Sequence, residues 1–183
     1  GTRYGLATLI PMVLFFCLAY WLDNRGVLSL GITALATWLG LTVTPQDLLR
    51  QNDFSSETLV VSGVFLGLFL TVVPFLSERW NFKKHFSLTY LNFGVHILMI
   101  STLAGMMALE SEILYFPLLC ISVAFFLWYA RTRGSFYFLT VPVIYGYIGL
   151  TYMIIVHTES LGMDFMFYLF YFILSCAGVI LFL

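Results

Sequence analysis

The sequence predicts an all-α protein, a polytopic bundle of about seven transmembrane helices that are joined by short loops and form a single domain over residues 1–183. Two observations lead to this fold class. Hydrophobic residues make up 61% of the chain and charged residues only 9%, whereas globular proteins carry about 25% charged residues. The charges also gather in short clusters, separated by apolar runs of about the length that crosses a bilayer. This composition excludes a soluble domain.

Seven apolar runs are expected to span the membrane as helices, because lipid leaves the backbone no other partners for its polar groups. They cover residues 4–22, 27–43, 58–76, 88–109, 113–130, 135–156 and 165–183. Little chain remains between them, so we expect no soluble catalytic module. The chain starts without an initiator Met and stops inside an apolar run at Leu183, which predicts a fragment of a longer protein.

The first three runs carry signs of interfacial anchoring and of close helix packing. Tyr20 and Trp21 stand just before the charged turn at Asp23, where aromatic side chains mark the membrane interface. In the third run, Gly63 and Gly67 form a G-x-x-x-G pattern. Such a pattern lets two helix backbones approach closely, so we expect a helix contact there.

The loop at residues 77–87 mixes aromatic and basic residues, as surfaces that rest on lipid headgroups do. Each basic residue near an anionic leaflet contributes about 1 kcal/mol of attraction. We therefore expect a lipid interface with anionic headgroups on the cytoplasmic face, whereas nucleic acid binding would need far more basic area. The residues expected there are Arg79, Trp80, Lys83, Lys84, Arg131 and Arg133.

The fourth run, residues 88–109, holds a strongly polar pair, Asn92 and His96, in otherwise apolar sequence. A helix places the two on one face, with His96 roughly 16 Å from the charged edge and so near the midplane. An ionisable side chain at that depth is costly unless it is neutral or paired, so it should face protein or a water-filled cavity. His96 is the first candidate functional residue. The alternative is that a neutral His96 only joins helices through hydrogen bonds.

The sixth run, residues 135–156, carries tyrosine hydroxyls and a proline, Pro142, where leucines would be usual. Counted from Arg133, Tyr145 and Tyr147 lie at about the depth of His96. We therefore predict a midplane binding cluster of Asn92, His96 and one of these two tyrosines. Kinked helices with polar groups at the midplane occur in transporters, although also in bundles that transport nothing.

Alternation of the seven spans sorts the charged connectors onto two faces. One face collects six basic and two acidic residues, and the other collects two basic and seven acidic residues. The positive-inside rule makes the basic face cytoplasmic, so the N-terminus of this chain is expected outside and the C-terminus inside.

No pattern in the sequence is typical of a metal, cofactor or catalytic site. Cys17, Cys120 and Cys176 lie inside predicted spans without a C-x-x-C spacing, so we expect small core residues. No paired acids and no H-E-x-x-H motif occur, and His96 and His157 lie at different depths. We expect no metal, no cofactor and no catalytic residue, and an enzyme is the least favoured function.

The segment at residues 20–45 resembles a large family of bacterial multi-span proteins, known as predicted membrane proteins with a domain of unknown function 2157. The matching features are an aromatic-then-Asp span end, the turn at residues 25–29, and the stretch from Ala34 to Gly40 that leads to Thr44-Pro45. The resemblance implies a bacterial inner (cytoplasmic) membrane protein with a further N-terminal part. It transfers no binding or catalytic residue.

Two functions remain open from the sequence. The first is a transporter, or a transporter subunit, for a small molecule or ion, which predicts a path to His96. The second is a structural or regulatory membrane module that acts through partner proteins, for which a second copy of the chain or another membrane protein is a candidate partner. The absence of a clear internal repeat weakens the first function, and the short loops favour the second.

Overall fold

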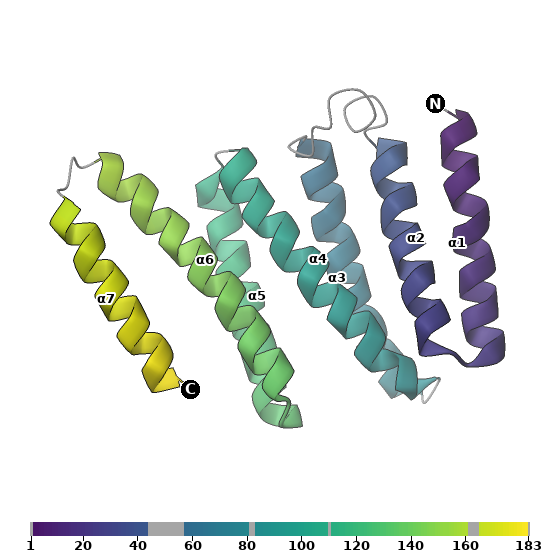
Figure 1. The fold of residues 1–183 in the computed structure, drawn as a ribbon. Coiled ribbons are helices and arrows are strands. Elements are labelled where there is room, and N and C mark those ends of the chain that lie inside the picture. Colours follow the sequence, from purple (N-terminus) through teal and green to yellow (C-terminus); the bar gives the residue numbers. More distant parts are fainter. Residues whose placement is uncertain (1, 44–56, 81–82, 110, 161–164, 183) are drawn as a thin grey trace. The chain divides into compact units, whose positions relative to one another are not determined.

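The computed structural model describes residues 2–43, 57–80, 83–109, 111–160 and 165–182. These residues form α-helices, one short 3-10 helix and no strand, which confirms the all-α class (Figure 1). The helices are α1 (Thr2–Leu22), α2 (Arg25–Val43), α3 (Glu57–Arg79), η2 (Lys84–Phe86), α4 (Ser87–Ala108), α5 (Glu112–Arg133), α6 (Phe136–Ser160) and α7 (Phe165–Phe182). Each predicted apolar run thus corresponds to one helix.

Four segments of the described chain are long and apolar enough to cross a membrane. They are Glu57–Arg79, Lys84–Ala108, Glu112–Arg133 and Phe136–Thr158, and the described part of α1 adds a shorter apolar helix at Leu6–Leu22. The protein is therefore a multi-pass membrane protein by the length and composition of its helices.

The chain divides into two compact units, Gly1–Gly149 and Leu150–Leu183. Within the first unit, successive helices run in opposite directions, so alternate connections lie at the same end (Figure 1). The α1–α2, α3–α4 and α5–α6 connections share one end, which we call the basic end and define as residues 23–25, 78–80, 83–86 and 131–135. The sequence predicted the same grouping of connectors, because successive spans must enter and leave the membrane on alternate faces.

Two of the turns at the basic end are built on backbone conformations that suit tight reversals. Asp23 has a left-handed φ of 56°, and the Asn24 side chain then caps α2 by accepting hydrogen bonds from the N–H groups of Gly26 and Val27, at 2.8 and 3.3 Å. Gly134, at the end of α5, has a φ of 63°, which glycine adopts without strain. These turns make the helical hairpins antiparallel.

The helix pair α3 and α4 forms the centre of the first unit, and it is packed through glycines. A Cβ atom on Gly67 would lie 2.6 Å from the backbone N and 2.7 Å from the Cα of Leu98. On the facing helix, a Cβ atom on Gly94 would lie 2.8 Å from Oγ1 of Thr71. The expected helix contact at the G-x-x-x-G pattern is therefore present, and its partner is α4.

Within the first unit, the part of α6 up to Gly149 contacts side chains of α4 and α5. Phe138 is only 2% exposed and packs edge-on against Tyr129 of α5, with ring centroids 5.6 Å apart. A Cβ atom on Gly149 would lie 2.2 Å from Cδ2 of Leu119 and 3.3 Å from Cδ2 of Leu103. These contacts fix the rotation of α6 about its own axis, and so determine which of its side chains face α4.

The second unit joins the end of α6 to α7. Its polar contact lies between the hydroxyls of Thr151 and Tyr171, 2.6 Å apart. Among the cysteines, the expectation of core positions is wrong for Cys17 and Cys120, which are exposed on α1 and α5. In a membrane helix such outward positions face lipid, where a thiol costs little because it behaves as a small apolar group.

Candidate functional site

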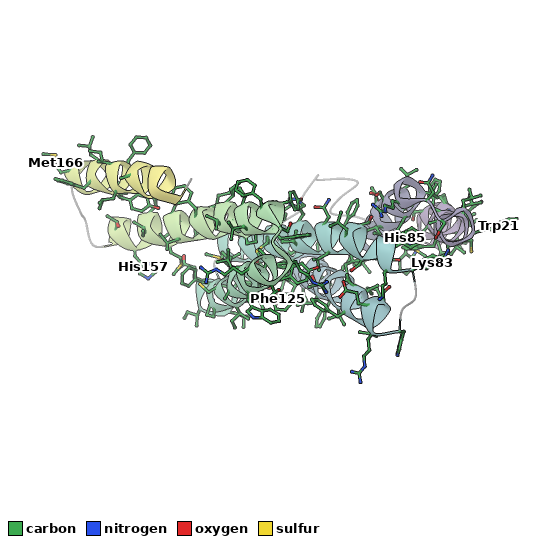
Figure 2. The ribbon with its side chains drawn as sticks, turned by 90° about the horizontal axis from the view of Figure 1, so that it is seen from below. Trp21, Lys83, His85, Phe125, His157 and Met166 are labelled. Atoms are coloured by element: carbon green, nitrogen blue, oxygen red, sulfur yellow. The ribbon has the colours of Figure 1, made fainter. Side chains whose placement is uncertain are left out.

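The basic end is tied together by ion pairs that cross between turns. Nζ of Lys83 lies 2.5 Å from Oδ1 of Asp23, and Nε2 of His85 lies 3.0 Å from the same oxygen. Figure 2 views the protein from below and shows Lys83 and His85 near the end of α1, where Trp21 is labelled. The hydrogen bond from Lys83 lowers the pKa of the Asp23 carboxyl below its ordinary value, which keeps this carboxylate charged.

A second ion pair joins α5 to α3 at the same end. The guanidinium of Arg133 donates to Oε2 of Glu78, and the hydroxyl of Ser87 donates to the other carboxylate oxygen at 3.3 Å. Both acidic residues of the basic end are thus engaged. Within the described residues, the basic side chains that lie exposed there without a carboxylate partner are Arg25, Arg79, Lys84 and Arg131.

This arrangement separates the six residues expected at a lipid interface into two groups. Lys83 and Arg133 hold turns together, whereas Arg79, Lys84 and Arg131 are exposed, as is Trp80 at 71%. The exposed group keeps a positive charge that no neighbouring acid offsets in the described residues.

The second polar cluster lies between α4 and α6, inside the predicted spans, and is centred on His96. Nδ1 of His96 lies 2.9 Å from the hydroxyl oxygen of Tyr145, and Nε2 lies 2.7 Å from the hydroxyl oxygen of Tyr137. The Tyr137 hydroxyl in turn donates a hydrogen bond to Oδ1 of Asn92. We call Asn92, His96, Tyr137 and Tyr145 the α4–α6 polar chain.

Helix geometry explains why these four side chains meet. Asn92 and His96 are four residues apart on α4, and Tyr137 and Tyr145 are eight apart on α6, so each pair lies close to one helix face. At about 1.5 Å per residue, the Cα atoms of the two tyrosines are about 12 Å apart along α6. Their long side chains extend toward each other, so that the two hydroxyls meet the two ring nitrogens of His96. The α4–α6 polar chain therefore runs along the two helices instead of lying at one level.

The α4–α6 polar chain begins near the basic end and reaches inward. Tyr137 is the second residue of α6, so it lies at the basic end of this helix, and it is 43% exposed. His96 lies about 14 Å beyond Ser87 along α4. Both of its hydrogen-bond partners, Tyr137 and Tyr145, come from α6.

The residue pattern predicted part of this cluster and missed one member. Asn92, His96 and Tyr145 lie together in the structure, and whether they bind a ligand stays a prediction. Tyr147 is 41% exposed, and the hydroxyls that His96 contacts are those of Tyr137 and Tyr145. The eight-residue spacing of Tyr137 and Tyr145 is a signal that would have identified the missing member.

The α4–α6 polar chain consists of hydrogen-bond donors and acceptors, and its His96 imidazole is the group that can carry a charge. Within the described ranges, no three His, Cys, Asp or Glu side chains gather in a way that would hold a metal ion. A histidine between two phenols can accept, donate and transfer protons without a cofactor.

No protein-family model matches this sequence, and neither a curated protein nor a solved structure does. The resemblance of residues 20–45 to a bacterial membrane family thus stays an expectation, and the site has to be interpreted from its own chemistry.

Proposed function

We propose that this protein transports a small molecule or ion across the membrane, alone or as a subunit of a larger transporter, and that the α4–α6 polar chain is its binding site. One observation carries the proposal: both ring nitrogens of His96 are hydrogen-bonded inside membrane-spanning helices. Polar and ionisable groups at such depth are expensive in lipid and most often mark a substrate or ion path.

The placement of the polar groups supports transport over simple helix packing. The close contact of α3 with α4 is made by glycines, and α6 is seated by Phe138 and by Gly149 against leucines. Packing in this unit thus uses small and apolar residues, and it does not need an imidazole. A hydrogen bond between helices contributes only about 0.6 kcal/mol on average in a membrane, so four polar side chains are a poor choice for stability alone.

The membrane setting that we propose is a seven-span protein whose basic end faces the cytoplasm. Support comes from the excess of exposed basic residues at that end and from the positive-inside rule. Arg25, Arg79, Lys84 and Arg131 would rest on anionic headgroups, with Trp80 at the interface. Location in a bacterial inner membrane rests on the resemblance of residues 20–45 alone.

The proposal is tested by two measurements on purified protein. Native mass spectrometry from mild detergent detects a bound solute, and current recordings on protein-containing vesicles under gradients of K⁺, Na⁺, Cl⁻ and H⁺ detect a moving ion. We expect a non-lipid mass or an ion current in the wild type that is lost in His96→Ala. Tyr20→Phe should retain it, because the Tyr20 hydroxyl bonds that of Tyr90 in a different part of the unit.

Two results would overturn the proposal. One is a clean apo mass together with silent vesicles for the wild type, and the other is a signal that His96→Ala leaves unchanged. In either case His96 joins helices only, and the structural or regulatory function with partner proteins takes the place of transport.

A further inference from the structure

The hydrogen bonds of the α4–α6 polar chain have a direction, and the phenol of Tyr137 sets it. A phenol has one proton to donate, and Tyr137 donates it to Oδ1 of Asn92. At 2.7 Å from Nε2 of His96, the Tyr137 oxygen must then accept, so Nε2 carries a hydrogen.

The other side of the imidazole follows from this assignment. A neutral imidazole with a hydrogen on Nε2 has a lone pair on Nδ1. Nδ1 therefore accepts a hydrogen bond from the hydroxyl of Tyr145, whose oxygen lies 2.9 Å away. Tyr145 thus donates to His96, His96 donates to Tyr137, and Tyr137 donates to Asn92. All three hydrogen bonds run in the same direction, toward Asn92 and the basic end.

We infer that this chain relays protons, so that the ion handled at the proposed transport site is H⁺. The inference rests on the proposed function and names its cargo. Hydrogen-bonded chains that contain a histidine are a known way to move protons through membrane helices, because imidazole can take a proton on one nitrogen and release one from the other.

The relay step balances in protons and charge. Tyr145 passes its hydroxyl proton to Nδ1 of His96 while its oxygen takes up the incoming proton. The resulting imidazolium gives the Nε2 proton to the Tyr137 oxygen, and Tyr137 releases its own proton to water at the basic end once that O–H has turned away from Oδ1 of Asn92. One proton enters and one leaves, no electron moves, and rotation of the hydroxyls with tautomer exchange at His96 restores the start.

Other polar contacts in the described residues lack a feature that this step needs. The Tyr20–Tyr90 and Thr151–Tyr171 pairs join two hydroxyls without a group that can hold an extra proton. The Asp23, Lys83 and His85 cluster lies in the turns and not along a span. Among the hydrogen bonds described above, those of the α4–α6 polar chain combine an ionisable group, bonds on both of its nitrogens, and a course along two membrane-spanning helices.

Proton flux into vesicles tests the relay directly. The full chain is reconstituted in vesicles with a trapped pH-sensitive dye, and a K⁺ gradient with valinomycin sets the membrane potential. We expect wild-type protein to acidify the lumen, and His96→Ala and Tyr137→Phe to fall to the rate of protein-free vesicles. Tyr20→Phe, which removes a tyrosine hydroxyl outside the chain, should keep the wild-type rate.

A second measurement keeps the inference testable if a variant in the chain fails to fold. In a protein with His85→Gln and His157→Gln, His96 is the remaining histidine of the three, and its ring nitrogens can be observed by nitrogen-15 NMR in bilayers. The direction of the chain requires a hydrogen on Nε2 and none on Nδ1 in the resting state. The reverse tautomer would overturn it.

The outcomes separate this inference from the proposed function. If H⁺ flux is absent but a solute or another ion gives a signal that depends on His96, the relay is wrong and the transport proposal stands. If the wild type moves nothing and binds nothing, both fail. Equal H⁺ flux in all variants would be a lipid leak, and it would also overturn the relay.

Discussion

Gly67→Leu is expected to abolish the packed pair of α3 and α4, and with it the folded first unit. The nearest neighbours of an added Cβ are the backbone N and Cα of Leu98, at 2.6 and 2.7 Å, and a backbone cannot move aside as a side chain can. The two helices would have to separate along their length. We expect destabilisation in the exceptional class, above about 4 kcal/mol.

The measurement is unfolding of the detergent-solubilised protein, followed by circular dichroism or by loss of the monodisperse peak. Gly178→Leu is the matched control, because nothing lies within 4 Å of a Cβ at that position on α7. Gly63→Ala should rank between the two, since its nearest neighbour is the rotatable Ser101 hydroxyl. Equal stability of Gly67→Leu and Gly178→Leu would refute the packing described for α3 and α4.

Phe138→Ala is expected to have the next largest effect and to damage the α4–α6 polar chain without touching a polar residue. Phe138 fills the contact between α6 and α5, and its ring lies 5.2 Å, centroid to centroid, from that of Tyr137. Truncating a buried phenylalanine costs about 3–5 kcal/mol through lost contacts and the remaining cavity. Without this contact α6 can rotate, and the tyrosine hydroxyls move away from His96.

Phe136→Ala is the control for this substitution, because Phe136 lies one helical position before Tyr137 and is 69% exposed. Exposed substitutions usually change stability by less than about 0.5 kcal/mol. Unfolding midpoints of the two variants, together with their H⁺ flux in vesicles, check the prediction. A Phe138→Ala protein with wild-type stability and flux would show that this contact does not position α6.

The regular geometry of helices explains how much of the site the sequence could predict. A rise of about 1.5 Å per residue was enough to bring Asn92, His96 and Tyr145 to similar depths in the membrane. The four membrane-spanning segments were predictable for the same reason, since their length and apolar character are properties of the sequence alone.

The choice of tyrosine needed information that depth does not contain. Tyr145 and Tyr147 stand at about the depth of His96, whereas Tyr137 lies about 12 Å before Tyr145 along α6. Which hydroxyls reach His96 depends on the rotation of α6. That rotation is determined by Phe138 against Tyr129 and by Gly149 against Leu119. These are contacts between residues far apart in the sequence, and hydrophobic periodicity along one helix does not predict them.

The basic end shows a similar limit. In the sequence, Lys83 and Arg133 stand among aromatic and basic residues that are typical of a lipid-facing surface. A single sequence does not show that the carboxylates of Asp23 and Glu78 lie within reach of them. The acids lie at or just after the ends of α1 and α3, and the alternating direction of successive helices brings these ends to the same side as Lys83 and Arg133. Charge sorting by face was predictable, whereas the pairing within that face required the fold.

The central claim is that the first unit crosses the membrane with its basic end on one side, and labelling of single cysteines tests this most directly. In a background with the three native cysteines replaced by serine, Arg25→Cys, Ser111→Cys and Ser135→Cys are made one at a time. A membrane-impermeant maleimide should reach Ser111→Cys from outside the cell, and the other two only after permeabilisation. Labelling of Ser111→Cys from the same side as Arg25→Cys would contradict the account.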